Sequence, residues 1–280
     1  MQPKAPINHL LKDNLEAMWN LLAQSTKGYA QHLTDTMHCF KAPTHLPYFN
    51  MCFQRTEASF TDEDKRLAHA FFEAPAGEHP TTFLQISTLK RTDQTVHADT
   101  LRRTFYLPLQ ENLRPSFCKT DETLHLSVLD PATPHDLKQK AHHSFFESMT
   151  NAFNLPPHSA HALLEPLPDF SLLYTAYARQ EEKTAGHLLV FCDPHKIAGA
   201  YMPKGSPAVQ QQLLSYAAVD LQKKGLQALL FPYNPTKENP ITPSLALNEI
   251  RSVDASFAPE PLWQEGSGSP LYTARPLTAD

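Results

Sequence analysis

Apolar residues recur along this chain at two spacings, one typical of helices and one typical of strands. From 8 to 24 the apolar positions stand three or four residues apart, as on one face of an amphipathic helix. The segment 48–54 is short and aromatic and follows a proline, which predicts a strand. The other elements predicted before residue 155 are a helix that begins after Thr61, a strand at 81–87, a short helix at 98–106, a strand at 124–130 and a helix at 134–151.

The strongest helix signals lie between Ser206 and Gly225. Ser206 can accept a hydrogen bond from the first N–H groups of a helix, Pro207 suits its first turn, and Gly225 suits its end. These signals predict a helix over 207–224. The pattern around it predicts strands at 171–179, 186–192, 196–202 and 226–231, a helix at 244–257, and strands at 261–264 and 271–275.

Proline clusters mark a division of the chain. Pro156-Pro157 and Pro166-Leu167-Pro168 frame a hinge or linker, because proline restricts its own backbone and that of the residue before it. A length of 280 residues also suits two units, since a domain has roughly 100 to 200 residues. We therefore expect an N-terminal domain at 1–155 and a C-terminal domain at 156–280.

Composition excludes several classes of protein. A net charge of −5 with no long basic run provides no footprint for nucleic acid, so we expect no nucleic-acid partner. No window approaches the roughly 20 apolar residues of a membrane helix, and the first eleven residues have no signal-peptide pattern. We expect a cytoplasmic protein without a membrane partner, with export by a signal-independent route left open. Oligomeric state is not indicated by the sequence.

Metal and nucleophile motifs were sought among the 15 histidines and 4 cysteines. Zinc sites need three or four converging ligands, and neither Cys-x-x-Cys nor His-Glu-x-x-His occurs, so no metal is expected. The cysteines, at 39, 52, 118 and 192, are expected to be reduced and mostly buried. Cys192 beside Asp193 and His195 could be a nucleophile, but neighbours in a strand and turn point in different directions, which favours a packed thiol.

The order of elements over 170–275 resembles that of the GNAT (GCN5-related N-acetyltransferase) family. The likeness is strongest in Ile-Ala-Gly-Ala-Tyr-Met-Pro at 197–203, then the long helix, then Lys-Gly-Leu-Gln-Ala-Leu-Leu-Phe at 224–231. The first half resembles the degenerate N-terminal half of tandem GNAT proteins, through its tryptophan-containing helix and Pro-Tyr-Phe-Asn at 47–50. The resemblance implies an α+β fold of two GNAT-like halves, each a mixed, mainly antiparallel sheet flanked by helices.

The resemblance also implies acetyl-CoA as co-substrate. In that family the turn before the long helix carries Arg/Gln-x-x-Gly-x-Gly/Ala, whose N–H groups bind the pyrophosphate. The matching segment at 205–210 is Gly-Ser-Pro-Ala-Val-Gln, which departs from the motif at Gly205, Ala208 and Gln210. Lys204 could hold a phosphate or be a solvated lysine, and Ser206 could donate its hydroxyl or only cap the helix. The cofactor-binding residues implied are Ala200, Tyr201, Met202, Lys204, Gly205, Ser206 and Ala208.

Catalysis in that family also needs an N–H that polarises the thioester carbonyl and an acid for the departing thiolate. A backbone N–H at 200–202 would serve the first role. Tyr233 and Asn234 are the nearest polar groups for the second, or they form a turn in which Tyr233 covers the sheet edge. The implied function is acetyl transfer to a small-molecule or peptide amine. The alternative is a catalytically silent GNAT-like protein that acts as a binding or scaffold module.

Overall fold

The computed structural model divides into two compact units, which we call the N-terminal and C-terminal units. The N-terminal unit holds Pro3–Arg103, Asn234–Glu238 and Gly266–Asp280, and the C-terminal unit holds Met1–Gln2, Thr104–Tyr233 and Asn239–Glu265. The structure describes residues 7–43, 49–56, 61–73, 83–86, 103–109, 124–134, 143–147, 150, 165–178, 183–233, 264–265 and 272–275.

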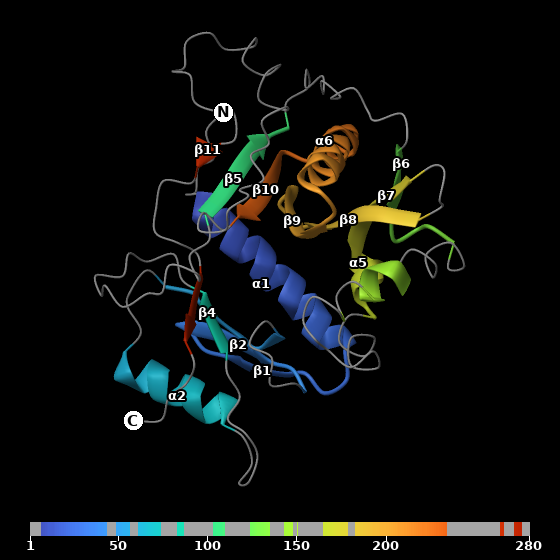
Figure 1. The fold of residues 1–280 in the computed structure, drawn as a ribbon. Helices are drawn as coiled ribbons and strands as arrows, with labels where there is room; N and C mark the ends of the chain where they lie inside the picture. Colours follow the sequence, from blue (N-terminus) through green and yellow to red (C-terminus); the bar gives the residue numbers. More distant parts are fainter. Residues whose placement is uncertain are drawn as a thin grey trace, which may run out of the picture. The chain divides into compact units, whose positions relative to one another are not determined.

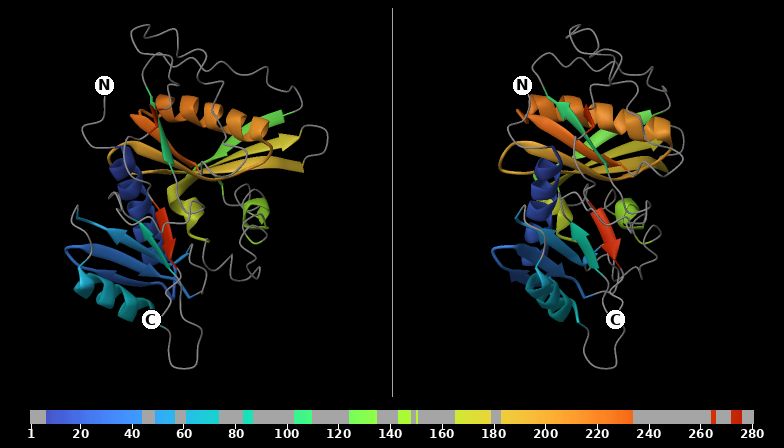
Figure 2. Two further views of the ribbon diagram at one scale, coloured as in Figure 1. Left: turned by 60° about the vertical axis from the view of Figure 1, so that its left-hand side comes forward. Right: turned by 90° about the vertical axis from the view of Figure 1, so that its left-hand side faces the viewer.

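The N-terminal unit is a five-stranded sheet with two helices. The strand order is β1-β2-β3-β4-β12, in which β3 and β4 are parallel and the other neighbours are antiparallel. Helices α1 and α2 lie on opposite faces of this sheet (Figures 1 and 2). The elements are α1 (Ile7–Ser25), β1 (Ala30–Leu33), β2 (Met37–Lys41), β3 (Met51–Gln54), α2 (Asp62–Phe72), β4 (Phe83–Ile86) and β12 (Tyr272–Arg275).

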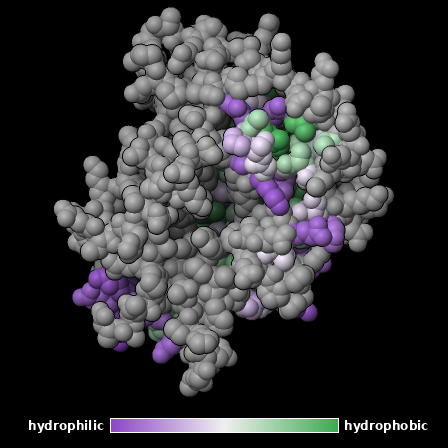
Figure 3. Space-filling view, viewed as in Figure 1, coloured by the Kyte–Doolittle hydropathy of each residue, from purple (hydrophilic) through white to green (hydrophobic). Residues whose placement is uncertain are grey.

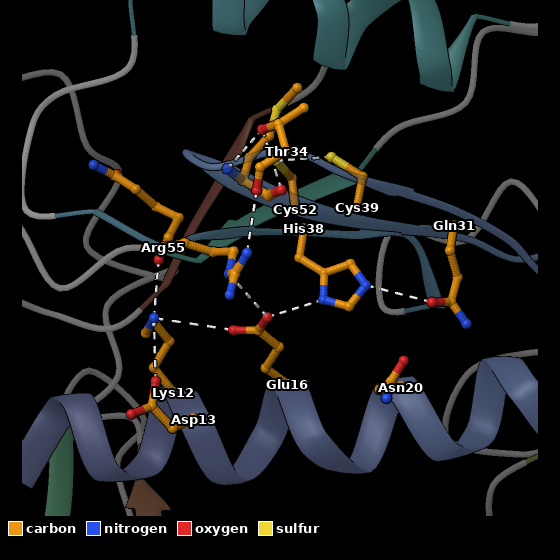
Figure 4. A network of polar contacts seen from close by, with 12 residues as sticks. Lys12, Asp13, Glu16, Asn20, Gln31, Thr34, His38, Cys39, Cys52 and Arg55 are labelled. Carbon is orange, nitrogen blue, oxygen red and sulfur yellow. Dashed lines mark hydrogen bonds and ion pairs between the residues drawn. The ribbon is translucent and has the colours of Figure 1, made fainter.

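Helix α1 buries both an apolar stripe and polar groups. Trp19 is 2% exposed and meets the Phe49 ring edge-on, with the ring centroids 6.0 Å apart. Beside this stripe, Lys12 donates from Nζ to the Gln54 carbonyl at 3.0 Å, and Glu16 lies 2.9 Å from Nδ1 of His38 (Figure 4). Buried charges need such partners, and these contacts hold α1 against β2 and β3.

Helix α2 begins with a capping box. The Asp64 N–H donates to Oγ1 of Thr61, and the Thr61 N–H donates to Oδ2 of Asp64. The Thr36 hydroxyl donates to the same carboxylate, and this hydrogen bond is the largest of the causes that lower the pKa of Asp64. The exposed face of α2 is charged, and the space-filling view shows hydrophilic residues at its position (Figure 3).

The C-terminal unit is a seven-stranded sheet with one long helix. The order is β11-β5-β10-β9-β8-β7-β6, in which β9 and β10 are parallel and the other described pairs are antiparallel. The elements are β5 (Arg103–Pro108), β6 (Leu124–Leu129), α5 (Leu167–Phe170), β7 (Ser171–Ala178), β8 (Lys183–Cys192), β9 (Ile197–Lys204), α6 (Pro207–Lys223), β10 (Ala228–Tyr233) and β11 (Gln264–Glu265).

Helix α6 lies along one face of this sheet (Figure 2) and contributes its buried residues to the core. Leu213, Ala217 and Leu221 have no exposed surface and pack against alternate residues of β7, β8, β9 and β10. Each fully buried leucine contributes on the order of 2 kcal/mol of hydrophobic stabilisation. The predicted helix at 207–224 is therefore confirmed almost to the residue.

Both units share one topological pattern. In each, a strand runs into a helix and then into a parallel strand beside the first: β3-α2-β4 in one unit and β9-α6-β10 in the other. In each, the first of the two parallel strands follows an antiparallel neighbour: β2 precedes β3, and β8 precedes β9. Mixed, mainly antiparallel sheets flanked by helices confirm the predicted α+β fold class.

Several predicted elements differ from the structure. The sequence predicts a helix at 98–106, but Arg103–Pro108 forms strand β5. This strand pairs with a segment distant in the chain, and the spacing of apolar residues within 98–106 does not reveal that pairing. Pro134 stands outside any helix, so the helix predicted over 134–151 does not begin there, but residues 143–147 within that range are helical as predicted. The hairpin of β1 and β2 had no prediction. Strand β10 begins two residues after the predicted start at Leu226. The predicted helix at 244–257 lies outside the described residues.

The compact units do not follow the predicted halves 1–155 and 156–280. Strands β5 and β6 pair into the sheet of β7–β10, and β12 pairs with β4 in the N-terminal sheet. The proline-rich stretch near 155 lies outside the described residues, and the boundary there stays a prediction.

Candidate functional site

The site begins where strands β9 and β10 stop pairing. Their described register covers three pairs, from Ala228 opposite Ile197 to Leu230 opposite Gly199. Strand β9 continues to Lys204 and β10 continues to Tyr233. Since the strands are parallel, both carboxyl ends lie at the same edge of the sheet, which is where α6 begins.

A bulge in β9 adds to this separation. His187 of β8 lies opposite Lys204, and Leu189 lies opposite Tyr201, so two steps along β8 match three steps along β9. The extra residue is therefore Met202 or Pro203. A bulge bends its strand and re-aims the groups beside it. It directs the end of β9 away from regular pairing immediately before the turn.

The turn after β9 depends on two glycines. Gly205 has φ +118°, a conformation that side chains rarely allow, and a Cβ there would lie 2.9 Å from the Ala185 carbonyl oxygen. A Cβ on Gly186 would collide with the Lys204 carbonyl oxygen and lie 2.7 Å from Cγ1 of Val209. The turn therefore packs backbone to backbone against β8, which fixes the position of the start of α6.

The start of α6 presents the N–H group of Ala208. Pro207 has none, the Val209 N–H donates to Oγ of Ser206 at 3.3 Å, and the Gln210 N–H donates to the Ser206 carbonyl at 2.9 Å. Among the hydrogen bonds that the structure describes, none uses the N–H of Ala208, whose side chain is exposed. The positive end of the helix dipole and the exposed Lys204 favour an anion at this point.

The side chain of Gln210 folds back onto the turn. Its Nε2 donates to the Gly205 carbonyl at 2.7 Å, while its Oε1 is buried and has no hydrogen-bond partner among the described residues. Gln210 stands where the resemblance implies a small residue. The side chain therefore takes up space beside the very N–H groups that an anion would approach.

His187 is a buried residue of this region that sequence reasoning missed. It is 2% exposed, and the Phe145 ring meets it edge-on at 5.0 Å between centroids. Within the part of the chain that the structure describes, its Nε2 has no hydrogen-bond partner. Burial, and secondarily the charge of Lys204, lowers the pKa of His187 to about 4, so the imidazole is neutral at pH 7. A single histidine within an apolar strand does not indicate a functional site, because the residue opposite it in the neighbouring strand is known only from the structure.

The structure places most of the predicted cofactor residues along one short segment. Ala200 and Tyr201 are buried in β9, Met202 lies at the bulge, and Lys204 to Ala208 form the turn and the first turn of α6. Tyr233 is the last residue of β10, and Asn234 lies outside the described residues. The roles of all these residues stay predictions.

Comparisons with known proteins concern the fold. Neither a protein-family model nor a curated protein matches the sequence. The solved GCN5-related N-acetyltransferase from Kribbella flavida is similar, with 8% identity, a TM-score of 0.49 and coverage of 85% of this chain and 91% of that one.

Two further GNAT structures are similar at the same level. The GCN5-related N-acetyltransferase from Sphaerobacter thermophilus has 12% identity, a TM-score of 0.47 and coverage of 75% of each chain. A tandem GNAT protein from the clavulanic acid biosynthesis pathway has 10% identity, a TM-score of 0.43 and coverage of 82% of this chain and 88% of that one. At such identities a function has to be argued from this chain's own residues.

Cys192 is better explained as a packed thiol than as a nucleophile. Burial and the Asp193 carboxylate raise its pKa to about 11, so the thiolate is scarce at pH 7. Asp193 holds the β8–β9 turn, where its Oδ1 accepts from the N–H groups of His195 and Ile197.

The described residues hold neither a cluster of metal ligands nor a helix that could span a membrane. In the part of the chain that the structure describes, no three His, Cys, Asp or Glu residues gather as metal ligands. None of the helices described is long and apolar enough to cross a membrane.

Proposed function

We propose that the C-terminal unit binds acetyl-CoA at the end of β9 and the start of α6 and transfers its acetyl group to an amine. The observation that supports this is the end of β9–β10 pairing at Gly199 and Leu230, directly before a glycine turn and a helix N-terminus. Unpaired strand ends leave backbone N–H groups available, and a helix N-terminus favours phosphate. The acceptor class proposed is a small-molecule or peptide amine.

The residues of the turn fit the phosphate part of such a ligand. The Ala208 N–H is a donor without a described partner, Lys204 supplies a point charge, and the Ser206 hydroxyl has a hydrogen available besides the bond it accepts. Bound acetyl-CoA would supply the thioester. Between Ala200 and Met202 the chain would donate a backbone N–H to the thioester carbonyl, while Pro203 has no N–H to donate.

A calorimetric titration with acetyl-CoA and with CoA tests this proposal. We expect heat of binding and a thermal shift, and both should weaken in Lys204→Ala. Lys196→Ala is the matched control, because Lys196 is an exposed lysine at the opposite end of β9. Absence of heat and of any thermal shift at millimolar ligand contradicts the proposal. Release of free CoA thiol with a panel of amines then tests transfer.

A second candidate is a catalytically silent binding module, and the side chain of Gln210 favours it. Its hydrogen bond to Gly205 holds a bulky amide beside the N–H groups that phosphate would need. If this bond blocks the site, the wild type should not bind acetyl-CoA and Gln210→Ala should bind it. Equal binding by both proteins removes the case for the silent module.

A further inference from the structure

Strands β2 and β3 bring two cysteines directly opposite each other. The described register pairs Met37 with Gln54 and Cys39 with Cys52. One residue earlier in β2, the Arg55 N–H donates to the Thr36 carbonyl at 2.9 Å, so that pair is a hydrogen-bonded one. Hydrogen-bonded and non-hydrogen-bonded pairs alternate along an antiparallel ladder. Counting three steps from Thr36 makes Cys39 and Cys52 a non-hydrogen-bonded pair, in which side chains come closest.

The two thiols are in contact. Their Sγ atoms lie 3.1 Å apart, and both cysteines are free (Figure 4). Residues directly opposite in such a pair have Cα atoms about 4.5 Å apart, which is within the range that a disulfide bridges. No backbone movement is therefore needed to bring the sulfurs into bonding range.

We propose that Cys39 and Cys52 form a reversible disulfide within the N-terminal sheet when the protein meets a peroxide or a small-molecule disulfide. Each thiol gives up its proton and one electron, and one S–S bond forms. With hydrogen peroxide, the two electrons break the O–O bond and the two protons complete two water molecules. With oxidised glutathione, the electrons break its S–S bond and two glutathione thiols leave.

The surroundings of the pair make the reaction slow in the folded protein. Both side chains have no exposed surface, and they pack with Met37, Ala68 and Phe72 under α2. The hydrogen bond with Cys39, burial, and the nearby carboxylates of Asp64 and Glu16 raise the pKa of Cys52, so the thiolate is rare. An oxidant reaches the pair when β2, β3 and α2 open locally, or before the unit folds. The rate of oxidation therefore reports that opening.

Refolding the full chain in glutathione buffers of increasing oxidised fraction tests the proposal at equilibrium. Trypsin cleaves after lysine and arginine, so Cys39 falls in the peptide 28–41 and Cys52 in the peptide 42–55. After alkylation without reduction, mass spectrometry should find these two peptides joined and lighter by two hydrogens than their sum. Reduction should separate them, and the oxidised protein should unfold at a higher urea concentration than the reduced one.

Three variants serve as controls. Cys39→Ala and Cys52→Ala should each lose the joined peptides and the shift in urea midpoint, and either one alone suffices if the other fails to fold. Cys192→Ala should keep both, because Cys192 lies in the other unit. The proposal is overturned if natively refolded wild type carries free thiols or separate glutathione adducts at both positions in the most oxidising buffer.

Discussion

The hydroxyl of Tyr174 donates a hydrogen bond to Oδ2 of Asp220 at 2.7 Å, which ties strand β7 to helix α6. Tyr174 is fully buried, and Asp220 also lies 3.1 Å from Nζ of Lys224. A carboxylate acceptor makes this bond stronger than one between neutral groups.

Tyr174→Phe should lower the free energy of unfolding by about 2 kcal/mol, because Asp220 then loses a buried donor. Urea denaturation measures the loss. Tyr216→Phe is the control: its ring meets Tyr174 edge-on at 5.8 Å, but its hydroxyl has no hydrogen bond in the part of the chain described. Equal losses in the two variants would show that the Asp220 bond contributes nothing specific.

His187 should make stability depend on pH in a defined window. Its pKa is about 4 in the folded protein against about 6.5 in an unfolded chain, so below pH 6.5 the unfolded state binds more protons. The stability due to the neutral imidazole is complete above pH 6.5. It should fall by up to about 3 kcal/mol as the pH drops to 4.

Urea denaturation at several pH values checks this expectation. His187→Leu should flatten the decline between pH 6.5 and 4 relative to wild type. His195→Leu, a change at an exposed histidine of the β8–β9 turn, should leave the decline unchanged. An unaltered slope in the His187 variant refutes the assignment.

Substitutions at two glycines with positive φ distinguish the cost of backbone strain from the cost of steric crowding. Gly205→Ala should destabilise more than Gly225→Ala, since a Cβ at Gly205 meets a carbonyl oxygen at 2.9 Å while one at Gly225 meets nothing within 4 Å. We expect a loss of about 1 kcal/mol at Gly225 from strain alone and about 3 kcal/mol at Gly205. The urea midpoints of the two variants measure these losses. Equal losses would mean that the turn at Gly205 rearranges to accommodate the Cβ without further cost.

The two helix caps should differ in strength. The Thr61 hydroxyl accepts a hydrogen bond from the Asp64 N–H at 3.1 Å and donates one to the Asp64 carboxylate at 2.7 Å, whereas the Ser206 hydroxyl accepts one bond at 3.3 Å. Thr61→Ala should therefore cost about 1 to 2 kcal/mol and Ser206→Ala about 0.5 kcal/mol. Amide hydrogen exchange in the first turns of α2 and α6 locates each effect. A larger loss at Ser206 would contradict this ranking.

The elements that sequence analysis located are those with strong local signals. Helix α6 has a serine cap, a proline in its first turn and a glycine after its end, so its bounds were predicted within one residue. Strand β5 was missed because its stability comes from β10 and β11, which are distant in the chain. Spacing within nine residues could not distinguish that strand from a short helix.

The features of the candidate site likewise divide into those with a local sequence signal and those without one. Ser206 and Pro207 were identifiable as a helix start, and the capping bond bears that out. The end of β9–β10 pairing and the bulge at Met202 or Pro203 depend on register between strands, which no local pattern encodes. His187 drew no attention for the same reason, since its importance comes from its position opposite Lys204.

Strand β12 has a kinetic consequence for the N-terminal sheet. Its residues Tyr272 to Arg275 pair with Phe83 to Ile86 of β4, across most of the length of the chain. Such a contact closes a very long loop, and pairings of this kind form late. During synthesis this edge of β4 has no partner strand until residue 275 has left the ribosome. In that interval it is an exposed strand edge that a chaperone or another nascent copy can occupy.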